Sequence, residues 1–126
     1  MIRILVTGSR HHRDQFLIYT SLTSVTAGLI GDGMDGPIVL VHGGADGADK
    51  IAKEWAESSG YKPEEHKARW TNEGFAAGPI RNQKMVDLGA DICVAFPEKA
   101  SKRTWDCLRR ARTAGIPVRI IEGSTK

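Results

Sequence analysis

Two glycines and two aspartates stand where an apolar run gives way to helix-forming residues. The run ends at Val41, and the sequence HGGADGAD follows it directly. Glycine adopts positive φ at little steric cost and lets a ligand approach the main chain closely. The helix that follows presents unpaired N–H groups and the positive end of its dipole, which favour a phosphate or another anion. We therefore predict a ligand-binding turn made of His42, Gly43, Gly44, Ala45, Asp46, Gly47 and Asp49.

The two aspartates of this turn leave three interpretations open. Asp46 and Asp49 have the three-residue spacing of a capping box, in which side chains satisfy the free N–H groups of a helix start. Two carboxylates would also repel a phosphate at this position. The aspartates therefore bind sugar hydroxyls, or they cap the helix while the phosphate lies nearer Gly43 and Gly44, or a cation lies between them and the phosphate.

Two further clusters carry residues that suit the same ligand. Gly8, Ser9 and Arg10 follow the first apolar run and are expected to complete the anion site from a neighbouring strand. Arg81 and Asn82, within the sequence GPIRNQKM, fall in the early turns of a later helix. A cation at a helix start opposes the dipole, so the position of Arg81 favours a partner anion.

Other conspicuous side chains have structural interpretations. Trp55 and Trp105 lie on apolar helical stripes and are expected in the core, as is Cys93 within an apolar run. Trp70 lies in the irregular stretch 67–78, where stacking on a base is an alternative to a core position. The sequence offers too few clustered His and Cys residues for a metal site, so we predict neither a metal nor a cofactor.

The spacing of apolar residues predicts the elements that position these clusters. Short β-branched runs without alternation are typical of parallel strands buried on both faces. Strands are expected at 2–6, 38–41, 92–96 and 118–121, with a weaker one near 61–66, and helices at 14–30, 48–58, 79–88 and 103–114. This order predicts an α/β fold, a Rossmann-like doubly wound three-layer sandwich with a mostly parallel sheet of about five strands. Ligands of such sheets bind beyond the carboxyl ends of the strands, where the polar clusters fall.

Composition narrows the function classes. The 126 residues favour one domain, 1–126, and 40% hydrophobic with 26% charged residues is typical of a soluble globular protein. The start of the chain reads as a strand rather than a signal peptide, no apolar run reaches membrane-spanning length, and a cytoplasmic location is expected. A net charge of +3 permits an anionic partner without requiring nucleic acid.

Five motifs in order resemble one known family. From Ile4 to about Val118 the chain is similar to the DUF2493 family, the YspA-type branch of the SLOG superfamily. The motifs that carry the similarity are TGSR, VHGGADGAD, GPIRNQKM, ADICVAFP and TWDCLRRARTAGIPV. The resemblance implies a Rossmann-like fold and a pocket for a nucleotide or nucleotide-derived ligand. It places Gly8, Ser9 and Arg10 on the first loop of the family, Gly43, Gly44, Gly47 and Asp49 on the second, and Arg81 and Asn82 on the third.

The sequence departs from this family pattern after Pro97. Relatives carry a second glycine-rich segment there, whereas this chain has EKASKRTWD, in which only Thr104 and Asp106 keep the pattern. The related cytokinin-activating phosphoribohydrolases (LOG proteins) place a catalytic glutamate where this chain has Cys107. A thiol does not replace that carboxylate in stabilising an oxocarbenium-like centre or activating water. Lys99, Lys102 and Arg103 offer charge in place of the lost backbone donors.

Three functions remain as hypotheses. The first is a binding module that senses or sequesters a nucleotide-derived ligand. The second is hydrolysis of a nucleotide N-glycosidic bond, with Asp49 or Asp106 as the acid–base group. The third is nucleic-acid binding like that of the related DNA-processing protein DprA, which the absence of a dense basic stripe with interleaved aromatics disfavours.

The apolar stripes of the last two helices raise the question of assembly. Trp105, Leu108 and Ala111 form one stripe, and Ile80, Met85 and Leu88 form the other. A small sheet has limited surface with which to cover both. Either the stripes pack wholly on the sheet of their own chain, or part of them forms a two-fold homodimer.

Overall fold

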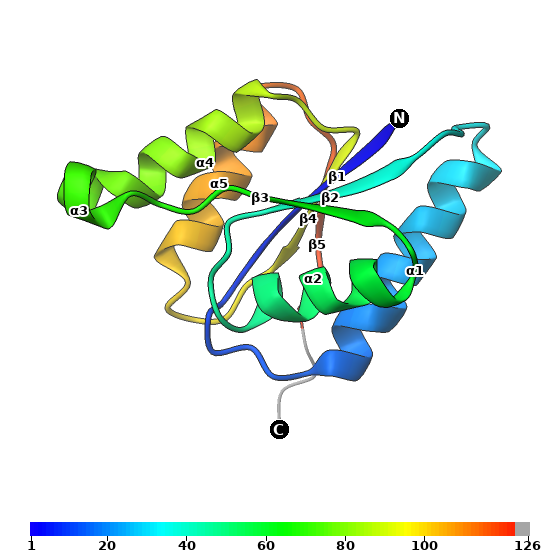
Figure 1. Cartoon of the computed structure of the whole chain (residues 1–126), viewed down its shortest axis with the longest axis horizontal. Coiled ribbons are helices and arrows are strands. Elements are labelled where there is room, and N and C mark those ends of the chain that lie inside the picture. The colour runs from blue at the N-terminus through cyan, green and yellow to red at the C-terminus, as the bar shows by residue number, and fades with distance from the viewer. Residues whose placement is uncertain (123–126) are drawn as a thin grey trace.

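The apolar runs of the sequence form a five-stranded parallel sheet that lies between two layers of helices (Figure 1). The computed structural model describes residues 1–122. The strand order is β3-β2-β1-β4-β5, and every neighbouring pair is parallel. The strands are β1 (Ile2–Gly8), β2 (Ile38–His42), β3 (Lys62–Glu65), β4 (Ile92–Phe96) and β5 (Val118–Ile120). The predicted α/β doubly wound architecture is confirmed.

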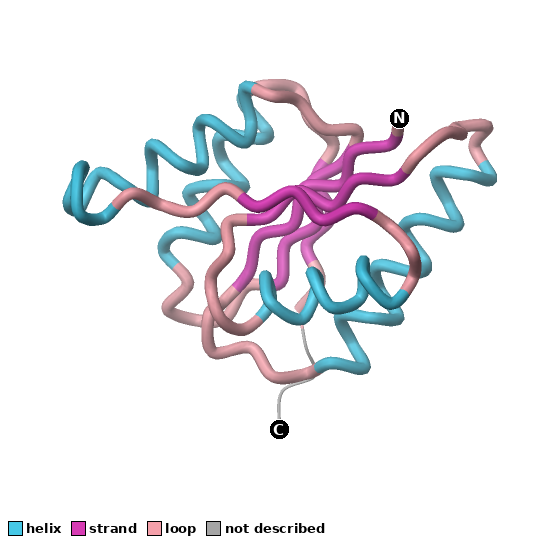
Figure 2. The backbone as a smooth tube through the Cα atoms, in the orientation of Figure 1, coloured by secondary structure: helices cyan, strands magenta, loops and turns pink. Residues whose placement is uncertain are grey.

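Helices cover both faces of the sheet, as Figure 2 shows by colour. The helices are α1 (Gln15–Gly31), α2 (Ala48–Ser58), α3 (Trp70–Glu73), α4 (Ala77–Asp87) and α5 (Lys102–Thr113). α1 and α2 pack on one face through Ile18, Leu22 and Trp55, and α4 and α5 pack on the other through Met85 and Ala111. The sheet therefore has two separate apolar cores, one on each face.

Burial on both faces explains why the central strands lack polar alternation. Every residue of β2 and β4 is buried, so each must be apolar or have a polar partner. β3 is different: its sequence KPEE is polar, and it lies at an edge of the sheet, where a proline does not interrupt the ladder. The predicted weak strand near 61–66 is this edge strand.

The expectation of an irregular stretch at 67–78 is wrong in part. α3 and a 3₁₀ turn at Gly74–Ala76 occupy most of it, and α4 begins at Ala77. Gly78 therefore lies inside the first turn of α4, where the Arg103 side chain packs so closely that a β-carbon would lie 2.6 Å from its Nε. Short helical turns thus connect the edge strand to the opposite helical layer.

The topology creates a crevice between β1 and β4. The chain moves outward from β1 through β2 to β3, then returns to the other side of β1 with β4 and β5. In such sheets the loops after the two strands at the reversal diverge to opposite faces, and ligands bind between them. The loops that follow Gly8 and Phe96 meet at this point.

Candidate functional site

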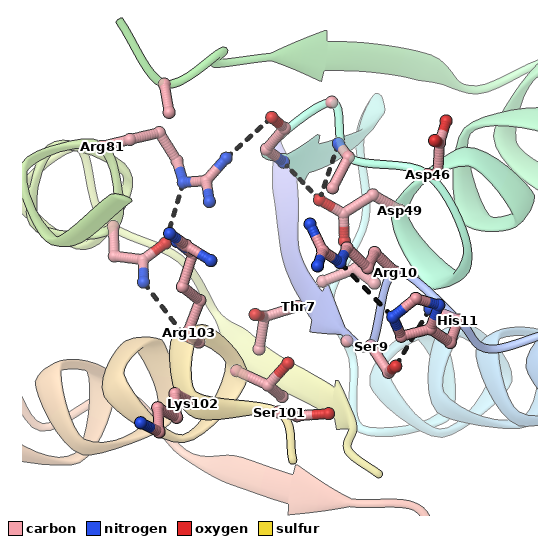
Figure 3. A pocket seen from close by; sticks show the side chains of 18 of the residues that line it. Thr7, Ser9, Arg10, His11, Asp46, Asp49, Arg81, Ser101, Lys102 and Arg103 are labelled. Carbon is pink, nitrogen blue, oxygen red and sulfur yellow. Dashed lines mark hydrogen bonds between the residues drawn. The ribbon is translucent and has the colours of Figure 1, made fainter. Parts of the chain in front are cut away.

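A cavity of about 830 Å³ opens at the carboxyl ends of β1, β2 and β4 (Figure 3). Its walls come from the loops after these three strands, from α3 and from the starts of α4 and α5. The predicted ligand-binding residues that line it are Gly8, Ser9, Arg10, Gly43, Gly44, Ala45, Asp46, Asp49, Arg81, Asn82 and Thr104. His42 and Gly47 do not line it. Residues from four of the five sequence motifs therefore face one volume, and none from ADICVAFP does.

The backbone N–H groups of the glycine turn are already engaged inside the turn. Gly43 and Ala45 donate to Oδ2 of Asp49 at 3.1 and 3.4 Å, and Gly44 donates to Nδ1 of His42 at 3.0 Å. Burial lowers the pKa of His42, which suits a neutral ring that accepts at Nδ1. The N–H groups of Gly43, Gly44 and Ala45 are therefore taken by side chains of the same region. At the start of the following helix, which the sequence predicts to offer N–H groups to a phosphate, Ala48 donates to the carbonyl oxygen of Ser9 at 3.0 Å.

The capping-box interpretation of the aspartates is also wrong. α2 begins after Gly47, whose position as N-cap involves no side-chain hydrogen bond. Asp46 is exposed at the cavity wall, and Asp49 turns back toward the preceding turn rather than along the helix. The two carboxylates therefore have different environments although they lie three residues apart.

The glycines of this region allow loops to pack against each other. Gly47 has φ +74°, and a β-carbon there would lie 2.4 Å from the carbonyl oxygen of Ser9. At Gly43 the same atom would lie 2.1 Å from Nη1 of Arg81. The first loop, the second loop and α4 therefore meet at positions that only glycine fits without a shift of neighbouring atoms.

Asp49 is the buried acid of the cavity. Its side chain lines the cavity at 5% exposure, and its Oδ1 has no hydrogen-bond partner within residues 1–122. Burial raises its pKa to about 6, against the opposing effects of the Arg81 charge and the two backbone N–H bonds. The carboxyl group thus changes charge near neutral pH and has one oxygen fixed and one free.

Arg81 and Asn82 brace the cavity from α4. Nη1 of Arg81 donates to the carbonyl oxygen of Gly43 at 2.8 Å, and its Nε donates to Oδ1 of Asn82 at 2.9 Å. The buried amide of Asn82 donates in turn to the carbonyl oxygen of Arg103 at 3.0 Å. These contacts tie the second loop, α4 and the start of α5 into one frame.

Asp106, the other candidate acid, lies outside the cavity lining. Its Oδ2 accepts from Asn82 at 3.1 Å and from Arg110 at 2.9 Å. Burial raises its pKa, but these two hydrogen bonds outweigh that effect and lower it overall. Its contacts are those of an ionised structural group rather than of an acid that faces a ligand.

The first loop is joined to the loop after β4 by a short polar chain. Ser9 donates its hydroxyl to Oε1 of Glu98 at 2.6 Å and accepts from the N–H of His11 at 3.0 Å. The N–H of Glu98 donates to the hydroxyl of Ser101 at 2.8 Å. The sequence did not identify Glu98 or Ser101 as site residues, although both follow a strand end at the predicted edge.

The start of α5 supplies a positively charged wall. Lys99, Lys102 and Arg103 line the cavity there, and the first turn of α5 contains no acidic residue. The guanidinium of Arg103 lies 4.5 Å from the centre of the Trp70 ring. Cations at this end of a helix oppose its dipole, so the arrangement favours an anion between them.

The lining as a whole carries more positive than negative side chains. The basic residues are Arg10, Lys67, Arg81, Lys99, Lys102 and Arg103, and the acidic ones are Asp46, Asp49 and Glu98. Within residues 1–122, no three His, Cys, Asp or Glu side chains come together as metal ligands. The cavity is therefore suited to an organic anion with both charged and neutral hydrogen-bonding groups.

Of the three residues predicted in the core, two are buried and one is not. Cys93 is buried as expected, and it packs with Cys107 in the core beneath α4 and α5. Cys107 therefore does not face the cavity at all. Trp55 is buried, but Trp105 is only half-buried because it lies toward the outside of α5.

Comparison with known proteins identifies relatives over this same framework. A family model described as the YspA, cpYpsA-related SLOG family matches residues 2–72, which include the first two loops and Trp70. The Gene 61 protein of Mycobacterium phage D29 is 44% identical over 124 residues, an alignment that covers 94% of each chain. No solved structure matches the chain. No helix within the described residues is long and apolar enough to cross a membrane.

Proposed function

The chain belongs to the YspA, cpYpsA-related SLOG family, and from that premise we propose that its cavity binds a nucleotide or nucleotide-derived ligand, as a sensor or sequestering module. The family resemblance drawn from the sequence motifs is confirmed by the family match. The coarse expectation of a nucleotide-related function follows from family membership. The finer statement rests on the lining of the cavity.

The observation that carries the proposal is the cationic wall at the start of α5. Lys99, Lys102 and Arg103 lie together at a helix end whose dipole would favour an anion, inside a cavity at the sheet reversal. These groups suit phosphate oxygens. The glycine turn, in contrast, has its N–H groups engaged and supports the ligand through side chains.

Trp70 supports the nucleoside part of the proposal. Its ring is half-exposed, lines the cavity and carries the Arg103 guanidinium at 4.5 Å. Aromatic rings with an adjacent guanidinium are common platforms for nucleobases, and such stacking contributes about 1–3 kcal/mol. A ligand with a base near Trp70 and phosphates near Lys102 would use both features.

Calorimetry with nucleosides and matching phosphates tests the proposal. AMP, ADP, GMP and GDP should bind more tightly than adenosine and guanosine. Lys102→Gln should weaken binding of the phosphates by about 3- to 10-fold, because a charge-assisted contact is lost. Lys84→Gln is the matched control, since Lys84 is exposed on α4 outside the cavity lining. Equal affinities for nucleosides and their phosphates would contradict a phosphate site at α5.

A hydrolase is the second candidate because of Asp49. A carboxyl group with a pKa of about 6 that faces a cavity is suited to act as a general acid near neutral pH. Cys107, at the position of the catalytic glutamate in LOG proteins, is buried and does not line the cavity. We therefore expect no more than trace release of free base from nucleoside 5′-monophosphates, measured by chromatography. Robust release that Asp49→Asn abolishes would replace the sensor proposal with a hydrolase.

A further inference from the structure

We propose that Oδ1 of Asp49 accepts a hydrogen bond from a ribose hydroxyl of the bound nucleotide, so that the cavity selects ribonucleotides over their 2′,3′-dideoxy counterparts. The inference rests on the nucleotide-binding function proposed above and names the part of the ligand that meets the second loop. It assigns Asp49 a role in specificity rather than in catalysis.

The two oxygens of Asp49 are not equivalent. Oδ2 accepts from the N–H groups of Gly43 and Ala45 at 3.1 and 3.4 Å, which fixes the plane and direction of the carboxyl group. Oδ1 is buried and has no partner among the described residues, although the side chain lines the cavity. Buried polar atoms are nearly always hydrogen-bonded, so an orphan acceptor at a cavity wall indicates a donor that arrives with the ligand.

Three kinds of group could approach Oδ1 of Asp49: a phosphate, a cation or a neutral hydroxyl. A phosphate offers acceptor oxygens and negative charge, which the Asp49 carboxylate repels. Arg81 has the strongest electrostatic effect of any cation on Asp49, but it forms no hydrogen bond with Oδ1, and its Nη1 and Nε are bonded to Gly43 and Asn82. A metal ion would lack further ligands, since no cluster of three candidate side chains exists within residues 1–122. A neutral hydroxyl donor satisfies Oδ1 without these conflicts.

The position of Asp49 fits a sugar next to a phosphate. Figure 3 shows Asp49 on the wall formed by the second loop and α2, and Lys102 and Arg103 on the wall formed by α5. A phosphate held at α5 places the attached ribose inside the cavity, and its 2′ and 3′ hydroxyls are the neutral donors nearest to that phosphate. A carboxylate that reads ribose hydroxyls beside a phosphate site is physically consistent with this division of charge.

The test compares ribonucleotides with analogues that lack both hydroxyls. Calorimetry at pH 7.5 measures the affinities of ADP and GDP and of their 2′,3′-dideoxy forms for the full chain. We expect the dideoxy forms to bind at least about tenfold more weakly, because a hydrogen bond to a charged group is lost. In Asp49→Asn, which retains an oxygen for the Gly43 and Ala45 N–H groups, this preference should fall to a few-fold. In Asp35→Asn, a control that removes an exposed carboxylate outside the cavity lining, it should be unchanged.

The outcomes separate this inference from the proposed function. Tight and equal binding of ribo and dideoxy forms would overturn the role of Asp49 while leaving the nucleotide site in place. A preference that survives unchanged in Asp49→Asn would also overturn it, because another group would then read the hydroxyls. Failure of every ribonucleotide to bind would overturn the nucleotide site itself and this inference with it. The wild-type comparison needs no variant, so poor folding of a variant does not prevent the test.

Discussion

Asp49 combines a structural task and a recognition task in one carboxyl group. One oxygen holds the glycine turn, and the other is buried at the cavity wall without a partner among the described residues. The sequence identified this residue as a ligand-binding candidate and left its role open; of the alternatives, the capping box is wrong because it requires Asp46 as N-cap. The helix begins after Gly47 instead, so the spacing of the two carboxylates no longer matches the free N–H groups. A shift of one residue in a helix start, which no local pattern decides, changes the assignment.

The raised pKa of Asp49 has a consequence for stability. Its folded pKa of about 6 lies above the ordinary 3.8, so the folded state binds more protons than the unfolded state between these values. Stability from this group is therefore present below pH 4 and is lost as the pH rises to 6, by about 3 kcal/mol. We expect the free energy of unfolding of Asp49→Asn, relative to wild type, to increase by this amount between pH 4 and pH 7 in urea titrations. A constant difference between the two proteins would contradict the assigned environment.

At the scale of elements, the pattern of apolar residues was sufficient to predict the strands and helices that bury a face. The runs at 2–6, 38–41 and 92–96 became strands because a parallel sheet buries both faces. The short helix at 70–73 escaped prediction because it has no buried residue, and helices of four residues are not stable alone. Tertiary contacts, including the stacking of Arg103 on Trp70, must stabilise it. The polar edge strand β3 similarly depends on a partner across the sheet.

That partner is Arg3. Its Nη1 and Nη2 donate to the Glu64 carboxylate at 3.1 and 2.9 Å, and its Nε donates to the carbonyl oxygen of Gly89. These contacts connect β1, β3 and the turn after α4. The hydrogen bond from Arg3, followed by that from His66, lowers the pKa of Glu64 to about 2.

We expect Glu64→Gln to weaken the fold in a pH-dependent manner. The depressed pKa means that the stabilisation is present above pH 4.5 and is lost as the pH falls toward 2. Because the side chain is 30% exposed, we expect a loss of about 1–2 kcal/mol at pH 7 rather than the full value of the shift. Urea titrations at pH 7 and pH 3 measure it. Glu57→Gln, at an exposed position of α2, is the control and should show no comparable change.

Gly47 tests the packing of the first two loops. A β-carbon there would lie 2.4 Å from the Ser9 carbonyl oxygen, in a residue with φ +74°. Gly60 has φ +78° but no atom within 4 Å of the same position. We expect Gly60→Ala to cost about 1 kcal/mol from backbone strain alone, and Gly47→Ala to cost roughly 2 kcal/mol more. Equal losses in thermal or urea unfolding would show that close packing of the loops does not matter.

At the scale of the whole molecule, part of the cavity could be predicted from the local sequence and part could not. Its glycine-rich walls could be predicted, because turns after parallel strands require such residues. The wall after Pro97 could be predicted only through the family resemblance, which sets Lys99, Lys102 and Arg103 in place of the backbone donors of relatives. The charge that selects an anion therefore comes from a segment whose local sequence carries no distinctive motif.

The burial of the two apolar stripes shows which of their residues remain available for assembly. Met85, Leu108 and Ala111 are buried in the core of their own chain, whereas Ile80 and Leu88 are 46% and 51% exposed. We propose that this exposed part of α4 contributes to a homodimer. Light scattering at micromolar concentration should then give about 27 kDa, twice the chain mass of 13.7 kDa.

Paired substitutions locate such an interface. Leu88→Ser should return the mass to that of one chain. Phe16→Ser, at a 78% exposed position on α1 in the opposite layer, should leave the dimer intact. A wild-type mass near 13.7 kDa would refute the dimer.

The glycine turn also bears on the speed of recognition. Its three amides are satisfied before any ligand arrives, so the wall holding Asp49 is rigid in the free protein. The conformational entropy of this loop is already lost during folding, so ligand binding does not have to order the loop again. A ligand thus meets a wall that needs no rearrangement, and we expect association in the range of about 10⁵–10⁷ M⁻¹s⁻¹ or faster, since charge steers the approach. Differences in affinity between ligands should then come mainly from their dissociation rates.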